Sequence, residues 1–389
     1  MTRDESVSSA APVSPPPLRG TDLDTVRAAL ESREPLPGTP GFAGVVEIDG
    51  QDHLVRDVLG RVPLFVERDQ PPTPNPTPAD AWAYTPEELD APLPFPAGAV
   101  ATPDDSAPQQ RWTLPEPDPI EDSDTARAVL ESAIETATTE AAATDAEIAV
   151  AFSGGVDSAL VAELLDAPLY VVGFPDSHDV EAARSAAAAM GRELTVVELE
   201  PADLERAVPE IARATGRTNA MDIQIALPLY LVGERVAADG FDALAVGQGA
   251  DELFGGYEKV VRLDHRVEAE TTRGAVREQI RSLPEQLPRD VRAIEAAGLE
   301  PVAPLLHDDV VSAALRLPDD LLADEETRKR GFRQVAAEHL PETVAMRDKK
   351  AVQYGSLVAR ELDRLARQAG YKRRMDDHVT KYVESLLEN

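Results

Sequence analysis

The feature that most constrains the fold is a short apolar run that ends on three small residues and leads at once into a helical pattern. Residues 147–152 read EIAVAF, the next three residues are Ser-Gly-Gly, and Asp157 and Ser158 then open the helix. A buried strand that turns directly into a helix is the building unit of a parallel sheet. The segment therefore predicts an α/β domain with a polar loop at a strand end.

Further strand patterns alternate with helical patterns on the C-terminal side of this segment. Apolar, β-rich runs stand at 169–174, 193–199 and 242–247, and helical sequence fills 179–190 and 224–239. Such alternation favours an open, doubly wound parallel sheet, in which ligands bind beyond the carboxyl ends of the strands. The predicted fold class is α/β with this sheet at its centre.

The N-terminal part of the chain has a different residue pattern, without the regular alternation of strands and helices. Residues 41–66 show short strand patterns broken by turns, and the run QPPTPNPTPAD at 70–80 holds five prolines in eleven residues. Acidic, proline-containing sequence at 115–123 reads as a domain boundary. We predict a disordered segment at 1–18, a small β-rich domain at 19–118, and the α/β domain with a mostly helical C-terminal part at 124–389.

The net negative charge of the chain excludes some classes of binding partner and indicates that the protein works at high salt concentration. The chain has 71 acidic and 38 basic residues and a net charge of −33, which repels nucleic acid and anionic membrane surfaces. The acids are spread along the whole chain and arginine outnumbers lysine, a pattern that we expect of a protein from a haloarchaeal cytoplasm. In molar salt the screening length is about 3 Å, so the charge says little about other partners.

Cysteine and histidine usage narrows the chemistry further. The chain has no cysteine, which excludes disulfides, thiolate nucleophiles and cysteine metal sites. The six histidines are scattered without the spacing of metal ligands. No run is apolar and long enough to span a membrane, and no secretory signal pattern is present, so we expect a cytoplasmic protein.

The Ser-Gly-Gly loop has the composition of a phosphate site. Glycines let the backbone approach a ligand, and the free N–H groups at a helix start attract an anion. Asp157 suits such a site only where a cation is also bound, and a carboxylate, Mg²⁺ and a phosphate satisfy one another. A plain turn whose acid caps the helix would also explain the segment. The chain contains no GxxxxGK[ST] loop.

A second glycine-rich turn follows the strand at 242–247. It reads GQGADELFGGY over 247–257 and places Asp251 and Glu252 just beyond the strand end. It fails as a dinucleotide fingerprint because position 252 is glutamate. Asp251 could meet Asp157 across the site and complete a metal site. An exposed turn with solvated acids is the alternative.

The two motifs together resemble a known family. S-G-G-x-D-S resembles the pyrophosphate loop of the ATP pyrophosphatase superfamily, which has the adenine nucleotide α-hydrolase-like fold. SGGVDSAL and GQGADELFGGY resemble the synthetase domain of the asparagine synthetase family and its β-lactam synthetase relatives. Ordered matches at 171–183, 226–237 and 329–356 extend the resemblance. GFAGVV, LVRDVLGRVPLF and FPAGAV resemble pieces of a class II glutamine amidotransferase domain of the Ntn type.

The resemblance implies an ATP-dependent ligase that forms an amide through an acyl-adenylate and releases AMP and pyrophosphate. Asparagine synthesis from aspartate and ammonia is the simplest form. It implies ATP contacts at Phe152, Ser153, Gly154, Gly155, Asp157 and Ser158, adenine or ribose contacts near Val172, Val246 and Gly247, Mg²⁺ on Asp157 and Asp251, and catalytic roles for Lys349, Gln248 and Asp251. For Lys329 and Arg333, a supporting role and a plain surface role both stay open.

The sequence also departs from the family. The amidotransferase-like part lacks the catalytic cysteine, so the N-terminal domain is predicted to be degenerate. Ammonia is then used directly, a separate glutaminase subunit supplies the amine, or the reaction differs. Gln248 stands where the family has glutamate or tyrosine; it cannot act as a general base but can position an amine. The family has an arginine at the position of Val302, an aspartate at that of His307, and often an arginine at that of Gln224. The lost arginines weaken the prediction that aspartate is the acceptor substrate.

A related adenylating enzyme with a different acceptor is one alternative function, and two others remain open. A non-catalytic, ATP-binding regulatory protein would explain the missing cysteine and Gln248. A tRNA thiolase is the other, although those sulfur-transfer enzymes mostly need cysteines. The clearest basic cluster, YKRRM at 371–375, reads as a solvated helix face, so nucleic acid is not an expected partner. A homodimer is a further hypothesis about assembly.

Overall fold

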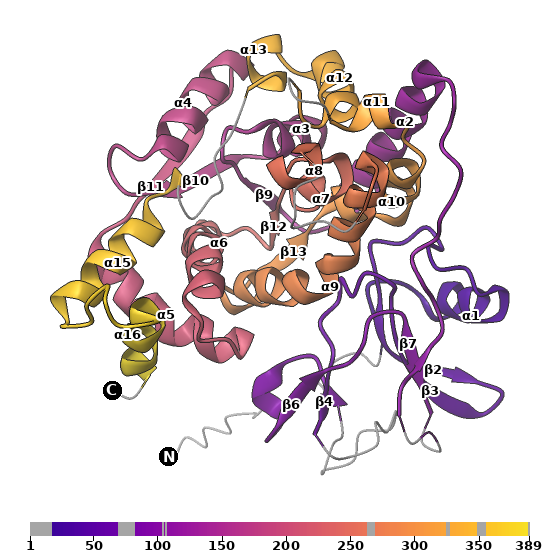
Figure 1. Cartoon of the computed structure of the whole chain (residues 1–389), viewed down its shortest axis with the longest axis horizontal. Coiled ribbons are helices and arrows are strands. Elements are labelled where there is room, and N and C mark those ends of the chain that lie inside the picture. The colour runs from indigo at the N-terminus through magenta and orange to yellow at the C-terminus, as the bar shows by residue number, and fades with distance from the viewer. Residues whose placement is uncertain are drawn as a thin grey trace, which may run out of the picture.

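The computed structural model describes residues 18–68, 82–102, 105, 107–262, 269–323, 327–347 and 355–387. Figure 1 shows the N-terminal strands gathered at one end of the molecule, below a larger region in which helices surround a sheet. The predicted segment at 1–18 and the proline-rich run at 70–80 fall outside the described residues, apart from Leu18, which begins the first strand.

The larger region is built on a five-stranded sheet in which every neighbouring pair is parallel. In spatial order the strands are β11 (Leu194–Glu198), β10 (Leu169–Gly173), β9 (Ile148–Ala151), β12 (Ala243–Ala245) and β13 (Glu300–Val302). Strands β10 and β11 lie on one side of β9, and β12 and β13 lie on its other side. The α/β, doubly wound prediction is confirmed, and the direction of winding changes between β9 and β12.

Helices cover both faces of this sheet because alternate strand residues are buried on opposite sides. Val150 and Val171 belong to one hydrophobic cluster, and Ala149 and Val172 belong to the other. The first face is covered by α2 (Ser123–Ala142), α3 (Val156–Leu165), α4 (His178–Met190), α10 (Asp308–Leu315) and α12 (Arg330–His339). The second face is covered by α5 (Pro201–Thr215), α6 (Ala220–Ala238), α15 (Val358–Gln368) and α16 (His378–Leu387), while α9 (Thr272–Ala296) contributes to both clusters.

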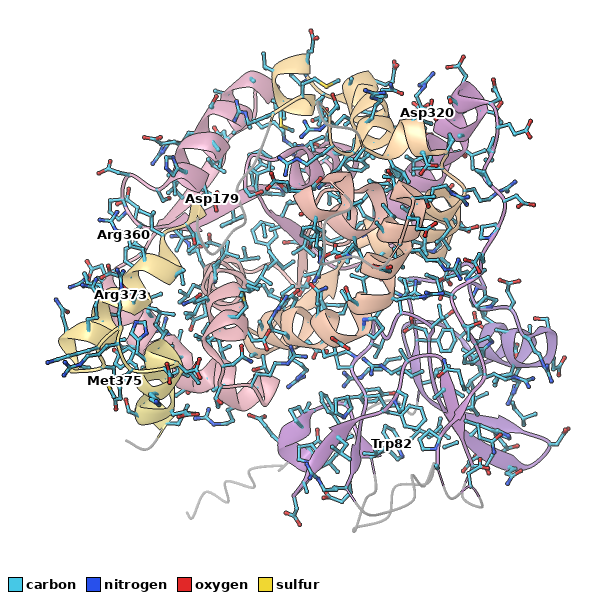
Figure 2. The ribbon with its side chains drawn as sticks, viewed as in Figure 1. Trp82, Asp179, Asp320, Arg360, Arg373 and Met375 are labelled. Carbon is cyan, nitrogen blue, oxygen red and sulfur yellow. The ribbon has the colours of Figure 1, made fainter. Side chains whose placement is uncertain are left out.

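Short helices complete the C-terminal half, which is mostly helical as predicted. They are α7 (Ala250–Phe254), α8 (Glu258–Arg262), the 3₁₀ turn η2 (Pro304–Leu306), α11 (Asp319–Leu322) and α13 (Glu342–Ala345). The YKRRM cluster is solvated, but it lies in the turn between α15 and α16 and not on a helix. Its Arg373, labelled in Figure 2, pairs with Asp363 of α15 at 2.7 Å.

The N-terminal region is β-rich, as predicted, and its strands pair antiparallel. One sheet has the order β1 (Leu18–Arg19), β2 (Ala43–Ile48), β3 (Gln51–Arg56), β7 (Ala99–Ala101) and β8 (Gln109–Gln110). A second has the order β5 (Trp82–Ala83), β4 (Phe65–Glu67) and β6 (Pro92–Pro94), and its Trp82 is labelled in Figure 2. The Asp49-Gly50 turn joins β2 to β3 with φ of 51° and 78°, as a two-residue hairpin requires. Helix α1 (Leu23–Ser32) and the 3₁₀ turn η1 (Pro86–Glu88) were not predicted.

A buried ion-pair cluster joins the two regions. The Arg61 guanidinium lies 2.9 Å from Asp57 in the N-terminal region and 2.7 Å from Asp308 at the start of α10. The same side chain donates to the Leu306 carbonyl at 2.8 Å, and the Thr39 N–H donates to Asp308 at 2.8 Å. These side chains are almost completely buried, so the contact holds one region against the other.

Within the described residues, no helix has both the length and the apolar surface that a bilayer crossing would require.

Candidate functional site

The carboxyl ends of β9, β10 and β12 open into a cavity of about 540 Å³. It lies where the winding of the sheet changes direction, which is where open α/β sheets bind ligands. The predicted site residues that line it are Phe152, Ser153, Asp157, Ser158, Val172, Val246, Gly247, Gln248 and Asp251. Gly154 and Gly155 belong to the same β9–α3 loop, and Lys349 lies outside the described residues.

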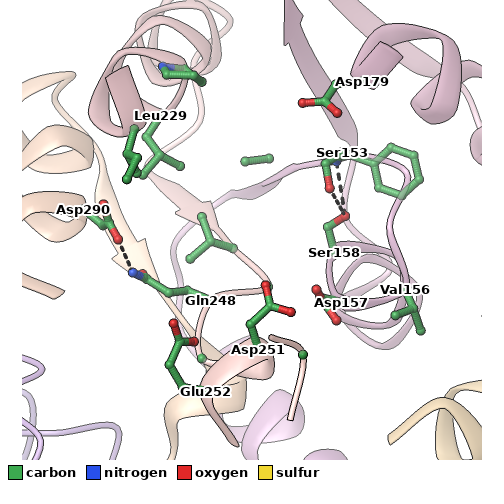
Figure 3. A pocket seen from close by; sticks show the side chains of 18 of the residues that line it. Ser153, Val156, Asp157, Ser158, Asp179, Leu229, Gln248, Asp251, Glu252 and Asp290 are labelled. Atoms are coloured by element: carbon green, nitrogen blue, oxygen red, sulfur yellow. Dashed lines mark hydrogen bonds between the residues drawn. The ribbon is translucent and has the colours of Figure 1, made fainter. Parts of the chain in front are cut away.

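The β9–α3 loop is held by hydrogen bonds among its own hydroxyl and backbone groups. The Ser153 N–H donates to the Ser158 Oγ at 3.2 Å, and the two Oγ atoms also lie 3.2 Å apart (Figure 3). Gly155 is the N-cap of α3 and offers no side chain to cap the helix. The first N–H groups of α3 therefore remain available to an anion at this end of the cavity.

Two glycines are required by close approach of the backbone. Gly154 has a φ of 72°, and a Cβ there would lie 2.5 Å from the Ala182 carbonyl carbon. A Cβ on Gly247 would lie 2.7 Å from the Ser158 nitrogen. The absence of a side chain at Gly247 lets the end of β12 pack against the start of α3, which brings the two glycine-rich turns together.

Asp157 of α3 and Asp251 of α7 approach one another across the cavity, as Figure 3 shows. Both bind the ammonium group of Lys329, which lies 2.8 Å from each Asp157 carboxylate oxygen and 2.6 Å from Asp251 Oδ1. Burial alone would lower the pKa of Lys329, but the two carboxylates raise it above its ordinary value. The lysine is therefore a buried cation that neutralises part of the charge of the two acids.

This donor set fits a magnesium ion. Carboxylates from two separate elements converge on one cationic centre, and hard oxygen donors of this kind are the ligands that Mg²⁺ takes in proteins, usually with phosphate oxygens and water. The two acids that the sequence assigned to Mg²⁺ thus have suitable chemistry and placement, and the assignment itself stays a prediction.

Lys329 and Arg333 both lie in the interior, so the surface role considered for them is wrong. Lys329 is 5% exposed and Arg333 is 6% exposed. Arg333 donates to the Ala345 carbonyl at 2.9 Å and to the Arg347 carbonyl at 3.0 Å. It therefore fixes the segment that leads toward Lys349, while Lys329 enters the site directly.

The other end of the cavity contains a polar network that the sequence did not predict. Gln248 Nε2 donates a hydrogen bond to Asp290 of α9 (Figure 3). Arg289 donates two hydrogen bonds of 2.6 and 2.9 Å to the same carboxylate. It donates a third, of 3.0 Å, to Asp222 of α6. Burial alone would lower the pKa of Arg289, but the carboxylates of Asp290 and Asp222 raise it above its ordinary value.

This network fixes the orientation of the Gln248 amide. Arg289 donates to both oxygens of Asp290, so both oxygens act as hydrogen-bond acceptors. Gln248 must therefore turn its NH₂ group toward Asp290, as the network assigns it. Its carbonyl oxygen is then the group that remains for a ligand in the cavity.

A third acid lies beside Asp251. Glu252 is 6% exposed, lines the cavity and accepts a hydrogen bond from the hydroxyl of Tyr257. Burial raises the pKa of Glu252 above its ordinary value, and the neighbouring Asp251 charge acts in the same direction. Three basic side chains, Arg328, Lys329 and Arg347, also line the cavity wall.

Three residues that depart from the family pattern, Val302, His307 and Gln224, do not line the described cavity. Val302 belongs to β13, and His307 is buried with its Nε2 3.1 Å from Glu140 of α2. Neither they nor Gln224 of α6 is among the described residues that line the cavity, although Ile225 is. Arg289 and Asp290 take part in the site instead. They come from α9, whose sequence offers only a charged pair in an amphipathic helix, so nothing local marked them.

Comparison with known proteins gives a consistent result. The family model described as asparagine synthase matches residues 129–287 and 263–387. A candidate glutamine-hydrolysing asparagine synthetase of Methanocaldococcus jannaschii is 28% identical over 277 residues, which cover 62% of this chain and 51% of that protein. Asparagine synthetase B of Escherichia coli, also described as glutamine-hydrolysing, is 23% identical over 369 residues, which cover 85% of this chain and 64% of that protein.

The alignments thus span between about half and two thirds of the length of these two relatives. A solved U34-tRNA thiolase from Methanococcus maripaludis aligns with 68% of this chain and 81% of its own at 13% identity and a TM-score of 0.28. A score this low carries no argument about this chain.

Proposed function

Because the chain belongs to the asparagine synthase family, we propose that it is an ATP-dependent ligase that forms an amide through an acyl-adenylate. The observation that carries the proposal is the convergence, in one cavity at the sheet's switch point, of the β9–α3 loop with Asp157 and Asp251. An ATP-binding regulatory protein is the alternative, and ATP turnover separates the two.

In the first step, an oxygen of the acceptor carboxylate attacks the α-phosphorus of ATP. A new P–O bond forms, the bond to the β-phosphate oxygen breaks, and pyrophosphate leaves with the electron pair. Ser153, Ser158 and the N–H groups at the start of α3 bind the phosphates, and Val172, Val246 and Gly247 line the adenosine end. A Mg²⁺ ion on Asp157 and Asp251 would neutralise phosphate charge as it develops.

We assign two lysines to the stabilisation of the same charge. Lys329 already lies between the two acids. Lys349, which the family resemblance assigns to the reacting phosphate, follows Arg347 by two residues in the sequence, and the Arg347 carbonyl accepts from Arg333. A fixed cation that meets the transferred group acts most strongly in the transition state.

In the second step, the lone pair of an amine attacks the acyl carbon of the adenylate. The C–N bond forms, the C–O bond to AMP breaks with its electrons on the phosphate oxygen, and the proton released from nitrogen passes to water. The Gln248 carbonyl, oriented by Asp290, accepts a hydrogen bond from the amine and positions it. Gln248 takes no proton itself.

Ammonia is the simplest amine for this chain, and aspartate is the simplest acceptor. The chain has no cysteine, so its own N-terminal region cannot hydrolyse glutamine by a thiol nucleophile. Free ammonium or a separate glutaminase subunit would supply the nitrogen.

The first experiment is an incubation of the purified protein in molar KCl with Mg-ATP, aspartate and ammonium, with AMP, pyrophosphate and asparagine assayed together. Asparagine formed in equal amount to AMP supports the full proposal. AMP without asparagine supports adenylation and rejects aspartate amidation. No AMP with any of a panel of carboxylates, despite measurable ATP binding, contradicts the proposal and favours a regulatory protein.

A further inference from the structure

Lys329 holds an unusual position for a residue at a helix start. It is the N-cap of α12, has a backbone φ of 57°, and is 5% exposed. Its ammonium group lies within 2.8 Å of three carboxylate oxygens, two from Asp157 and one from Asp251. An ammonium has three N–H donors, so these oxygens account for all of them.

The arrangement answers an electrostatic problem of the nucleotide-free protein. Two carboxylates that face one centre repel one another, and solvent screens the Asp157 charge poorly because its side chain is only 8% exposed, whereas the Asp251 side chain is 45% exposed. The lysine reduces their combined charge from −2 to −1 and occupies the oxygens that a metal ion would use. A divalent cation that arrives alone must therefore displace an ammonium that is already well coordinated.

Gly256 provides the room for this lysine. A Cβ on Gly256 would lie 1.9 Å from Asp251 Oδ1 and 2.6 Å from Lys329 Cε. The β12–α7 turn and the residues after it are therefore shaped around the contact between the lysine and the acid, which makes this contact a built feature of the site.

We propose that Lys329 is a resident counterion of the metal site, so that the divalent cation enters only together with the nucleotide. The inference rests on the proposed ATP site. Lys329 lines the same cavity as the β9–α3 loop, and a polyphosphate bound at that loop offers the lysine new anionic partners. A change in its flexible four-carbon side chain transfers the ammonium from the carboxylates to the phosphate, and the acids become free for the metal at the moment when it is needed.

The test measures Mn²⁺ binding by electron paramagnetic resonance, with and without α,β-methylene-ATP, on the full-length protein. The wild-type protein should bind Mn²⁺ at the site at least tenfold more tightly with the nucleotide analogue than without it. Lys329→Met should raise the affinity for Mn²⁺ alone at least tenfold. Lys372→Met, at an exposed position in the turn between α15 and α16, is the matched control and should leave both affinities unchanged.

Surface acids also bind Mn²⁺, so the background needs its own variant. The double variant Asp157→Asn/Asp251→Asn keeps the surface charge and loses the site, and its binding is subtracted at the same KCl concentration. The comparison within the wild-type protein does not decide the role of Lys329 by itself, because the phosphate oxygens of the analogue also bind Mn²⁺; if Lys329→Met does not fold, Lys329→Gln is the second uncharged variant.

Two results would overturn the proposal: wild-type protein that binds Mn²⁺ alone as tightly as with the analogue, or folded Lys329→Met protein with unchanged affinity for Mn²⁺ alone. Failure of the proposed ATP site gives a different result, because the analogue would then bind to neither protein. In that case the Mn²⁺ affinity of Lys329→Met without nucleotide still decides whether the lysine is a counterion.

Discussion

The substitution Gln248→Glu tests the polar network at the end of the cavity that is proposed to receive the amine. In the native protein the Gln248 amide donates to Asp290, whose carboxylate Arg289 holds from the other side. An ionised glutamate of the same length places a second carboxylate against the first and has no hydrogen to donate. Because the Asp290 side chain is only 6% exposed, water screens this repulsion poorly.

Two estimates bound the size of the effect. Two unit charges about 4 Å apart interact by roughly 4 kcal/mol at an effective dielectric constant near 20. The new carboxyl can escape this repulsion by keeping its proton, which for an ordinary glutamate pKa near 4.3 costs about 3.7 kcal/mol at pH 7 and about 1 kcal/mol at pH 5. In its protonated form the carboxyl donates its O–H to Asp290 in place of the amide, so no loss of a hydrogen bond is added to this cost.

The sign of the pH dependence follows from the raised pKa of the new carboxyl. Its folded form binds a proton that the unfolded chain has already lost, so the stability of the variant falls as the pH rises above about 4.3. Relative to wild type, Gln248→Glu should lose about 1 kcal/mol at pH 5 and roughly 4 kcal/mol at pH 7.

The assay is urea unfolding of both proteins at pH 5 and pH 7 and one fixed KCl concentration, followed by circular dichroism. Gln248→Met is the control, because it removes the hydrogen bond without a charge and should lose about 1 kcal/mol at both pH values. If the Glu variant loses the same stability at pH 5 and at pH 7, Asp290 is not an ionised neighbour and the assigned amide orientation is wrong.

The remaining predictions concern catalysis and the contact between the two regions. Asp157→Ala and Asp251→Ala should each abolish Mg-ATP-dependent AMP release, and wild-type rates in either would contradict the metal assignment. Lys349→Ala should keep ATP affinity, measured by calorimetry, while the rate falls by orders of magnitude, as expected for a lost transition-state contact; a weakened affinity with an unchanged rate would refute this. Arg61→Met leaves two buried carboxylates without their cation and should destabilise the protein by about 3–5 kcal/mol, seen in thermal unfolding, whereas Arg27→Met on the exposed face of α1 should change it by less than about 1 kcal/mol.

The sheet was predictable because its signal is local. Four of its strands carry apolar runs bounded by turn residues, and their alternation with helices predicts a parallel sheet, whereas the spatial order of the strands comes from the structure. The fifth strand, β13, was not predictable in this way, since Glu300–Val302 has three residues, one of them proline, and is a strand only because it pairs with β12. Helix α1 was missed although Asp22 caps it by accepting from the Thr25 N–H, which is a signal that the sequence does contain.

The candidate site, like the sheet, has parts that the local sequence predicts and parts that it does not. The β9–α3 loop and the β12–α7 turn each carry their own motif, so both were found and their acids were expected to meet. Lys329 stands in the run TRKRGFR, whose charges are typical of a solvated helix face, and it becomes buried only because α12 packs against α2, α3 and α7. Local sequence therefore locates the phosphate loop and the acids, whereas the cation between them depends on tertiary packing.

The contacts of Arg289 indicate whether it can bind the carboxylate of the acceptor substrate, which the sequence alone could not indicate. The arginines that the family resemblance led us to expect at the positions of Val302 and Gln224 are absent, and a buried guanidinium elsewhere in the cavity wall would be the obvious substitute. Arg289 already donates to both Asp290 oxygens and to Asp222, and bidentate pairs of this kind are among the strongest in proteins. A substrate carboxylate must compete with two resident ones for this arginine. Arg289 is therefore a poor replacement for a free acceptor-binding arginine, and its main effect is to hold Asp290 as the anion that orients Gln248.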